Sequence, residues 1–354
     1  MEDELTVTGT QPRPRGATLE EVARLAGVSR ATVSRVVNGS PRVSDEVRRS
    51  VESAVSQLGY VPNRAARSLV TRRSGSIAVV IAEPPGRLFS DPFFPRLLRG
   101  ISAALTTRDL QLVLLMPATP ADTRRTADYL AAGHVDGALL VSLHGDDPLP
   151  ERMTRAGIPF VHGGRPLRGT GTSLVDVDNR GGAKSAVDHL IANRRTVVAT
   201  ITGPSDMGAG VDRLSGYRDA LTEAGRPIDD RLIVSADFTQ EGGAAAMDRL
   251  LKANPAIDAV FVASDLMAAG ALAVLNAAGR RVPEDVALVG YDDSPIALSV
   301  SPQLTSVRQP IEEMGQEMAR VLISAVEEAE PVQRRVILAT ELIKRASSAG
   351  RRQP

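Results

Sequence analysis

Apolar residues follow two different periods along this 354-residue chain. Near the N-terminus they recur every three or four residues, which is the period of one face of an α-helix. This pattern predicts three short helices, over residues 19–26, 30–38 and 44–58, each followed at once by a glycine. Two short helices joined by a tight turn and packed against a third have the order of a helix-turn-helix domain.

After position 75 the apolar residues instead form short β-like runs, and amphipathic segments lie between these runs. The runs predict buried parallel strands over 77–82, 111–116, 137–141, 158–161, 196–202, 232–235, 259–263 and 286–290. The segments between them predict helices over 94–107, 124–132 and 148–156 and from positions 183, 216, 242, 266 and 311. The expected fold class is therefore an N-terminal all-α helix-turn-helix domain plus an α/β two-lobed core of doubly wound parallel sheets.

Polar residues at the starts of the N-terminal helices support these boundaries. Thr18 and Glu21 have the spacing of a capping box, and Ser29 is suited to cap the second helix. The third helix is expected to begin at Ser44, with two acidic residues in its first turn, where the helix dipole favours them.

The second predicted helix combines a valine face with a polar outer face. Arg30 or Arg35 can bind a guanine through two hydrogen bonds, and Ala31 can lie against a thymine methyl group. The other polar residues suit phosphate contacts. An ordinary three-helix domain with a polar surface is the alternative. The residues predicted to contact DNA in this domain are Thr18, Ser29, Arg30, Ala31, Thr32, Ser34, Arg35 and Asn38.

Charge is concentrated in the same part of the chain. The whole chain is neutral, but the segment from Arg13 to Gly75 holds twelve arginines against five acids, a net charge of +7. Such a basic block favours a polyanion as partner. Its last part, residues 61–75, reads either as a flexible linker or as a segment that folds on DNA with an apolar wedge. The predicted contacts in it are Asn63, Arg64, Arg67 and Leu69.

Composition and missing motifs argue against several classes of protein. The chain has no cysteine, and its four histidines lack metal-ligand spacing, so we expect no metal site. No G-x-G-x-x-G follows the first strand and no phosphate-binding G-x-x-x-x-G-K-[ST] motif is present, so no cofactor and no catalytic residues are expected. The absence of a signal peptide and of a long apolar stretch predicts a cytoplasmic protein without a membrane partner.

The stretch TLEEVARLAGVSRATVSRVVNGSPRVSDEVRRSVESAVSQLGYVPNRAARSLVTRRSG resembles the head and hinge of the lactose-repressor (LacI) family of bacterial regulators. The phrases SDPFFPRLLRG, DVDNRGG, VFVASDLMAAGAL and VPEDVALVGYDD resemble the periplasmic-binding-protein-like core of the same family. The resemblance implies that the linker forms a hinge helix in the minor groove, with Leu69 as the intercalating residue. It also implies that Arg30 and Ala31 select the operator sequence.

The resemblance also implies an effector site between two lobes, near 76–176 and 177–305, with two further crossings near 306–335. Some of the implied site residues have a second interpretation: Phe94 and Phe238 as core, and Asp265 as a cap of the helix at 266. Ser264 and the Gly163–Arg165 segment depart from the family pattern, which puts the identity of the ligand in doubt. The implied effector residues are Phe93, Phe94, Arg213, Phe238, Ser264, Asp265, Asp292 and Gln309.

These observations predict a sequence-specific DNA-binding regulator, a repressor that binds a pseudo-palindromic operator on double-stranded DNA as a homodimer. A small-molecule effector, expected to be a sugar or sugar derivative, would control it. The alternatives are a transporter's solute-binding protein and a sugar-modifying enzyme fused to a DNA-binding head. The expected domains are a disordered extension at 1–17, a DNA-binding domain at 18–60, a hinge at 61–75, a core at 76–346 and a disordered tail at 347–354.

Overall fold

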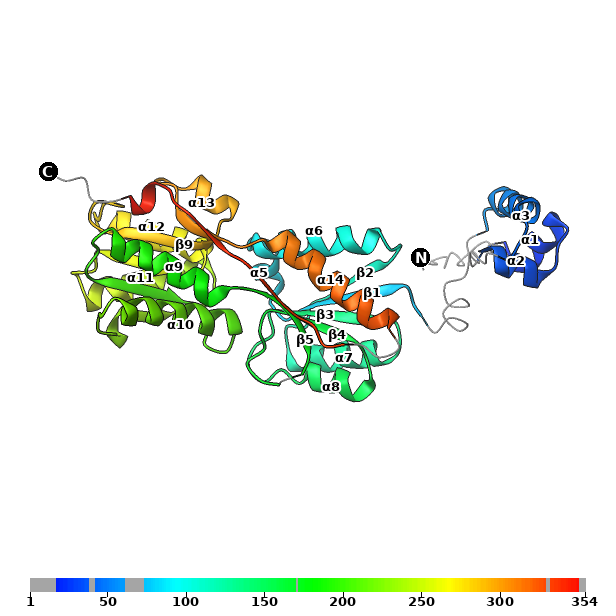
Figure 1. Ribbon diagram of the computed structural model, residues 1–354, viewed down its shortest axis with the longest axis horizontal. Helices are drawn as coiled ribbons and strands as arrows, with labels where there is room; N and C mark the ends of the chain where they lie inside the picture. The colour runs from blue at the N-terminus through cyan, green and yellow to red at the C-terminus, as the bar shows by residue number, and fades with distance from the viewer. Residues whose placement is uncertain (1–16, 38–41, 61–72, 170, 329–331, 350–354) are drawn as a thin grey trace, which may run out of the picture. The chain divides into compact units, whose positions relative to one another are not determined.

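The chain divides into two compact units, Met1–Ser74 and Gly75–Pro354. Figure 1 shows the computed structural model, which describes residues 17–37, 42–60, 73–169, 171–328 and 332–349.

The first unit contains the three predicted helices, α1 (Leu19–Ala26), α2 (Arg30–Val37) and α3 (Asp45–Leu58). Their apolar faces meet in a small core around Val22 and Val33, which are fully buried. The helix starts agree with the sequence prediction to within one residue, and the order is that of a helix-turn-helix domain.

The predicted capping box at the start of α1 is confirmed. The backbone N–H of Glu21 donates to Thr18 Oγ1 at 3.3 Å, and the N–H of Thr18 donates to Glu21 Oε2 at 2.7 Å. Two otherwise unpaired amides are thereby satisfied. The turn after α1 is made by Gly27, whose φ of +66° lies in the left-handed region that favours glycine.

The first lobe of the second unit is a six-stranded parallel sheet in the order β11-β5-β4-β3-β1-β2. Its strands are β1 (Ser76–Ile81), β2 (Gln111–Leu115), β3 (Gly137–Val141), β4 (Phe160–Gly163), β5 (Ser173–Val177) and β11 (Arg335–Leu338). Its helices are α5 (Pro85–Ser90), α6 (Phe93–Thr106), α7 (Pro120–Ala131), α8 (Leu149–Ala156) and α14 (Ile311–Glu327).

Helices cover both faces of this sheet. The apolar sides of α6 and α14 pack on one face, and those of α7 and α8 pack on the other. Figure 1 shows α14, from late in the sequence, lying beside α6. The two helices approach closely at Gly100, where a Cβ atom would collide with the backbone of Glu312.

The second lobe repeats this plan with the strand order β12-β10-β9-β8-β6-β7, in which only β12 is antiparallel to its neighbour. Its strands are β6 (Val198–Thr202), β7 (Ile233–Ser235), β8 (Ala259–Val262), β9 (Ala287–Asp292), β10 (Thr305–Arg308) and β12 (Glu341–Ile343). Its helices are α9 (Asn179–Ala192), α10 (Gly208–Glu223), α11 (Gln240–Ala253), α12 (Asp265–Ala277) and α13 (Pro295–Ser299). The pair α9 and α10 covers one face, and the pair α11 and α12 covers the other.

Three chain segments connect the lobes: one after β5, one between β10 and α14, and one between β11 and β12 (Figure 1). The first two lie where the family resemblance implies them. The third lies a few residues later than expected, because Arg335–Leu338 still pairs with β5 in the first lobe. The carboxyl ends of the parallel strands therefore border the region between the lobes, which is where α/β sheets bind ligands.

The sequence prediction missed strands β5, β10, β11 and β12, and it placed the starts of α9 and α10 four and eight residues too late. The missed β11 and β12 have half-exposed patterns, so they lack the continuous apolar run of a buried strand.

The predicted disordered tail is wrong for residues 347–349. Ser347 and Ser348 are fully buried in a 3₁₀ turn that packs against β9 and β10. Ser347 Oγ donates to the carbonyl of Leu288 at 2.6 Å and accepts from the N–H of Thr305 at 2.8 Å. Small polar side chains that complete a sheet edge cannot be distinguished from a polar tail by composition. The rest of the predicted tail lies outside the described residues.

Candidate functional site

The outer face of α2 presents the side chains that the sequence predicts for DNA contact. Arg30, Ala31 and Arg35 are exposed, whereas Val33 and Val36 beneath them are buried. Arg30 Nη1 lies 3.1 Å from Glu20 Oε1, and both side chains are largely exposed. An exposed pair of this kind stabilises little, so Arg30 can exchange its partner for a base or phosphate.

Two other residues that are predicted to contact DNA, Ser29 and Thr18, also cap helices. Ser29 Oγ accepts from the N–H of Thr32 at 3.1 Å and shares a hydrogen bond with the hydroxyl of Thr32 at 2.9 Å, so the predicted cap is confirmed. The hydroxyl of Thr18 is part of the capping box. Ser34 is half-buried on α2. Several predicted contacts lie outside the described residues, namely Asn38, Asn63, Arg64, Arg67 and Leu69.

A cavity of about 500 Å³ lies in the second unit, lined by residues from both lobes. Its volume falls within the range of small-molecule sites. Three of the eight implied effector residues line it, Phe93 from α6, Arg213 from α10 and Gln309 from the crossing after β10.

Arg213 is the central buried charge of the cavity wall. Its Nε donates to Asn179 Oδ1 at 2.8 Å, and its Nη1 donates to the carbonyl of Ala263. Nη1 also lies 3.6 Å from Asp292 Oδ1, and the guanidinium carbon lies 3.6 Å from the centre of the Tyr291 ring. A buried charge is tolerated only with such partners, which also hold the side chain in one orientation.

Asp292 ends β9 beside this arginine. It is almost fully buried, accepts from Gln309 Nε2 at 2.5 Å and has a φ of +106°. Burial raises its pKa well above the ordinary value, and the charge of Arg213 opposes this rise. A non-glycine residue with such a φ is strained, and strain of this kind clusters at functional sites.

Asp176 and Asn179 are site residues that sequence reasoning missed. Both line the cavity, and Asp176 Oδ1 accepts from Asn179 Nδ2 at 2.9 Å. Asn179 in turn holds Arg213, so a chain of hydrogen bonds runs from β5 in the first lobe to α10 in the second. Burial raises the pKa of Asp176. The phrase DVDN, which contains both residues, resembles the family, but the resemblance did not indicate which of its residues contact the effector.

Two implied effector residues are aromatic side chains with different surroundings. Phe94 is in the core of the first lobe and 1% exposed, which agrees with its interpretation as a core residue. Its role as an effector contact stays a prediction. Phe238 is outside the cavity lining but faces the other lobe, with its ring centre 5.2 Å from the guanidinium carbon of Arg87. Phe238 has a φ of +64°, another strained position beside the cleft.

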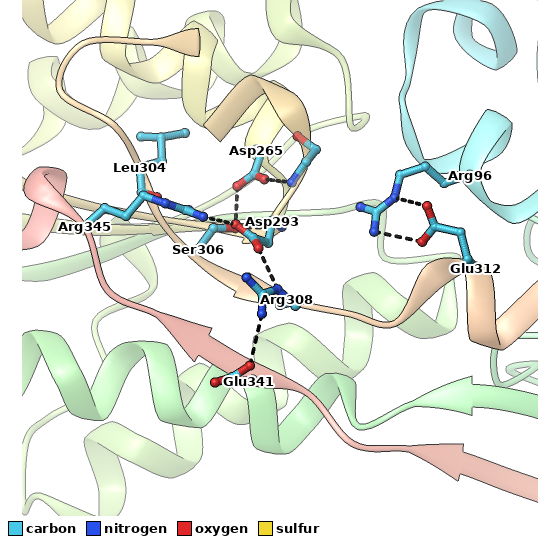
Figure 2. Close-up of polar contacts among 10 residues, drawn as sticks. Arg96, Asp265, Asp293, Leu304, Ser306, Arg308, Glu312, Glu341 and Arg345 are labelled. Atoms are coloured by element: carbon cyan, nitrogen blue, oxygen red, sulfur yellow. Dashed lines mark hydrogen bonds and ion pairs between the residues drawn. The ribbon is translucent and has the colours of Figure 1, made fainter. Parts of the chain in front are cut away.

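Ser264 and Asp265 hold the second lobe together and do not line the cavity. Ser264 Oγ accepts from the N–H of Met267 at 3.2 Å and caps α12, so the cap is Ser264 and not Asp265. Asp265 is fully buried and accepts from the N–H of Ser294 at 2.7 Å and from Ser306 Oγ at 2.6 Å (Figure 2). Burial raises its pKa. That these two residues contact the effector stays a prediction, which the lining of this cavity does not support.

The neighbour of Asp292 anchors the turn after β9. Asp293 accepts from Arg308 Nε at 2.7 Å and from Arg345 Nη2 at 2.5 Å (Figure 2). Arg345 also donates to the carbonyl of Leu304 at 2.7 Å. These contacts fix the backbone that positions Asp292, so Asp293 holds the turn.

Polar pairs also connect the two lobes at the mouth of the cavity. Arg165, after β4, makes two hydrogen bonds to Asp212 of α10, at 2.9 and 2.7 Å. His144, after β3, lies between Glu83 of its own lobe and Asp206 of the other, and the backbone N–H of Gly145 donates to the carbonyl of Asp206. The Gly163–Arg165 segment, which departs from the family pattern, thus places an arginine in the lining of the cavity.

Within the described residues, no helix is long and apolar enough to cross a membrane, and no cluster of acids and histidines suits a metal ion.

Comparison with known proteins decides the family. Residues 18–63 match the family of bacterial regulatory proteins called the lacI family, and residues 187–348 match a periplasmic binding protein-like domain. The HTH-type transcriptional regulator CelR of Thermobifida fusca is 52% identical over 339 residues, which is 95% of this chain and 99% of that protein. The chain belongs to the lacI family.

Solved structures of lacI-family regulators agree with the fold. A structure of the transcriptional regulator CelR in complex with cellobiose has a TM-score of 0.76 and 50% identity, covering 94% of this chain and 99% of that one. A lac repressor dimer bound to operator and the anti-inducer ONPF has a TM-score of 0.83 and 26% identity, with the same coverage. The predicted family and fold class are confirmed, and the chain is a DNA-binding transcription regulator. These relatives are regulators rather than enzymes.

Proposed function

We propose that this lacI-family regulator is a repressor that binds a pseudo-palindromic operator as a homodimer and is released by a neutral sugar bound between its lobes. The helix-turn-helix head supports the DNA part, because α2 exposes Arg30, Ala31 and Arg35 above a buried valine face. Two-fold symmetry of a dimer requires inverted half-sites in the operator.

The observation that carries the sugar part is the buried Arg213–Asp292 pair in and beside the wall of the 500 Å³ cavity. Buried carboxylates with few donors are stabilised by ligand hydroxyl groups, which donate hydrogen bonds. We propose Phe93, Arg213, Asp292, Gln309, Asp176 and Asn179 as effector contacts, with Phe238 closing the cleft. Cellobiose is the first candidate, because the 50% identical CelR structure contains it.

The charges around the cavity favour a neutral ligand. Three arginines line it, and in the described structure each already has an acidic partner: Arg165 with Asp212, Arg168 with Asp146, and Arg213 with Asp292. A phosphate group would have to displace one of these carboxylates, whereas a neutral sugar would not.

The proposal is tested by measuring operator binding with and without sugars. An operator is first selected from a library of random palindromic duplexes with the full-length protein, and affinity is then followed by fluorescence anisotropy at fixed salt. Cellobiose is expected to weaken operator binding by about 5–150-fold, the usual size of such coupling. Tighter operator binding with cellobiose would make the sugar a corepressor. If the protein selects no duplex from the library, the DNA-binding part of the proposal is contradicted.

The same preparation separates the rival functions. A solute-binding protein would bind cellobiose but select no DNA. A sugar-modifying enzyme would convert cellobiose on prolonged incubation, which chromatography of the sugar detects. We expect the sugar to be recovered unchanged.

A further inference from the structure

The cavity extends from the Arg213 region into the first lobe, toward helix α8. Pro150 and Thr154 of α8 line this part, together with residues of the segment after β4. We refer to the part bounded by Pro150, Thr154 and His162 as the side chamber. It belongs to the same cavity as Arg213 but is formed by the first lobe.

His162 is the buried polar side chain of this chamber. It lies on β4, is 5% exposed and lines the cavity. Its neighbour Val161 belongs to the core under α6 and α14, so alternation along the strand directs His162 to the opposite face, where α8 packs. Phe160 contacts its ring edge-to-face at 5.4 Å between centres.

Within the described part of the chain, no hydrogen bond to the His162 ring is found, although other polar side chains of the wall have partners. Burial lowers the pKa of His162 to about 4, so the ring is neutral at physiological pH. A neutral imidazole presents one N–H donor and one acceptor nitrogen. Because the ring lines the cavity, its N–H and its acceptor nitrogen are open to a ligand, and a ligand hydroxyl can pair with either of them.

The position of His162 separates it from the Arg213 region. His162 pairs with Leu174 on β5, so Asp176 lies one strand across and two residues further along. These backbone positions are roughly 8 Å apart, given 4.8 Å between strands and 3.3 Å per residue. Side chains at positions 162, 174 and 176 lie on the same face of the sheet, so one ligand with hydroxyl groups at both ends can contact the Asp176–Arg213 chain and the side chamber together.

We infer that the side chamber is a second sugar subsite and that His162 hydrogen-bonds the second ring of a disaccharide effector. This inference rests on the proposed function, since it assumes that the cavity binds a neutral sugar. The inference assigns selectivity for disaccharides over monosaccharides to the first lobe. It assigns this selectivity to His162, which contacts none of the charged groups around Arg213.

The test uses full-length protein and cellobiose as the probe, with calorimetric affinities at pH 7. His162→Phe is expected to weaken cellobiose binding at least tenfold, because the ring keeps its volume but loses both polar groups. His162→Gln keeps a donor and an acceptor and is expected to stay within about threefold of wild type. The matched control is His134→Gln, an exposed histidine of the same lobe that stacks on Tyr129.

A second readout needs no variant and so does not depend on whether His162→Phe folds. The chain has four histidines, whose ring signals can be resolved by NMR. The His162 signal is expected to shift on addition of cellobiose and to stay constant with pH between about 5.5 and 8. Equal cellobiose affinity in wild type and a folded His162→Phe, or an unshifted His162 signal in the saturated complex, would overturn the subsite alone. Failure of wild type to bind cellobiose would overturn the proposed effector, and the subsite with it.

Discussion

The Nδ1 atom of His144, in the first lobe, lies 3.1 Å from the Oδ2 atom of Asp206, in the second. The other ring nitrogen of His144 lies 3.1 Å from Glu83 Oε1. A neutral imidazole has one N–H, so both nitrogens can donate to carboxylates only when the ring carries two protons. The hydrogen bond to Glu83 is the main cause that raises the pKa of His144; Asp206 adds to the rise and burial opposes it. The contact with Asp206 across the two lobes therefore favours the protonated ring.

Closure of the lobes is expected to weaken as pH rises. Glu83 lies in the same lobe as His144 and raises its pKa whether or not the lobes are together, whereas Asp206 raises it further only when they are. The contribution of His144 to closure is therefore complete below its pKa in the separated lobes and is lost as pH rises through its higher pKa in the closed form. Glu83 also pairs with Arg87 of its own lobe, so this contact does not depend on closure. Distances between spin labels on the two lobes should lengthen as the pH is raised.

The absence of cysteine makes this measurement specific. Labels at Asp128→Cys on α7 and Ala253→Cys on α11, both exposed positions, report the distance between lobes in protein diluted with unlabelled subunits. Asp206→Asn should remove most of the pH dependence, since a neutral amide does not favour the charged ring. An unchanged pH dependence in Asp206→Asn would show that another group is responsible.

Arg213→Met is expected to abolish the response to the effector while operator binding survives. The substitution removes three polar contacts and the contact with the Tyr291 ring, and it leaves Asp292 buried without its cationic partner, at a cost of about 3–5 kcal/mol in stability. Asp292→Asn in the same chain should recover part of this stability but not the response. Operator affinity with and without sugar, together with urea unfolding of both variants, checks the prediction. A full sugar response in Arg213→Met would place the effector elsewhere.

Arg30→Ala is expected to weaken specific operator binding by about 1–3 kcal/mol, the usual contribution of one arginine–guanine pair. Glu20→Ala is the matched control, because it removes the exposed partner of Arg30 without touching the DNA-facing group. That pair stabilises the head by at most about 1 kcal/mol, so Glu20→Ala should leave affinity nearly unchanged or slightly raised. If Arg30→Ala loses as much affinity for random DNA as for the operator, Arg30 contacts a phosphate and not a base.

Gly100→Ala tests the close packing of α6 and α14. A Cβ atom on Gly100 would meet the backbone of Glu312, which cannot move without separating the helices. The expected loss is about 1–3 kcal/mol, as for other overpacked sites. Gly86→Ala is the control, because a Cβ there meets nothing within 4 Å. The midpoint of thermal unfolding should be clearly lower for Gly100→Ala than for Gly86→Ala. Similar midpoints would mean that the two helices can separate at little cost in free energy.

The sequence predicts what depends on local pattern. The helices of the head follow from apolar spacing and from the Thr18–Glu21 capping box, both of which act within a few residues. The sequence also predicts most strands that have a continuous apolar run, because such a run is a local pattern. Strands β11 and β12 were not, because their places are fixed by pairing with β5 and β10, far away in the sequence.

The candidate site was predictable only where the family resemblance supplied residues. Arg213, Asp292 and Gln309 contact one another, and Arg213 and Gln309 line the cavity. The resemblance did not show the structural contacts of Asp265, whose partners Ser294 and Ser306 become neighbours only when β9 and β10 form their sheet. Likewise, no local pattern shows that His144 and Asp206, 62 positions apart, come together across the two lobes.

A phosphorylated sugar should bind at least tenfold more weakly than cellobiose. The three arginines of the cavity wall are each paired, and the pair of Arg165 with Asp212 is a double hydrogen bond between the lobes. A phosphate that captures Arg165 must break this contact and lie near Asp176, Asp206 and Asp212. Asp212→Asn frees Arg165 from its acidic partner and should narrow the difference between cellobiose and cellobiose 6-phosphate. Calorimetry on both proteins measures the ratio of the two dissociation constants, and tighter binding of the phosphate by wild type would contradict a neutral effector.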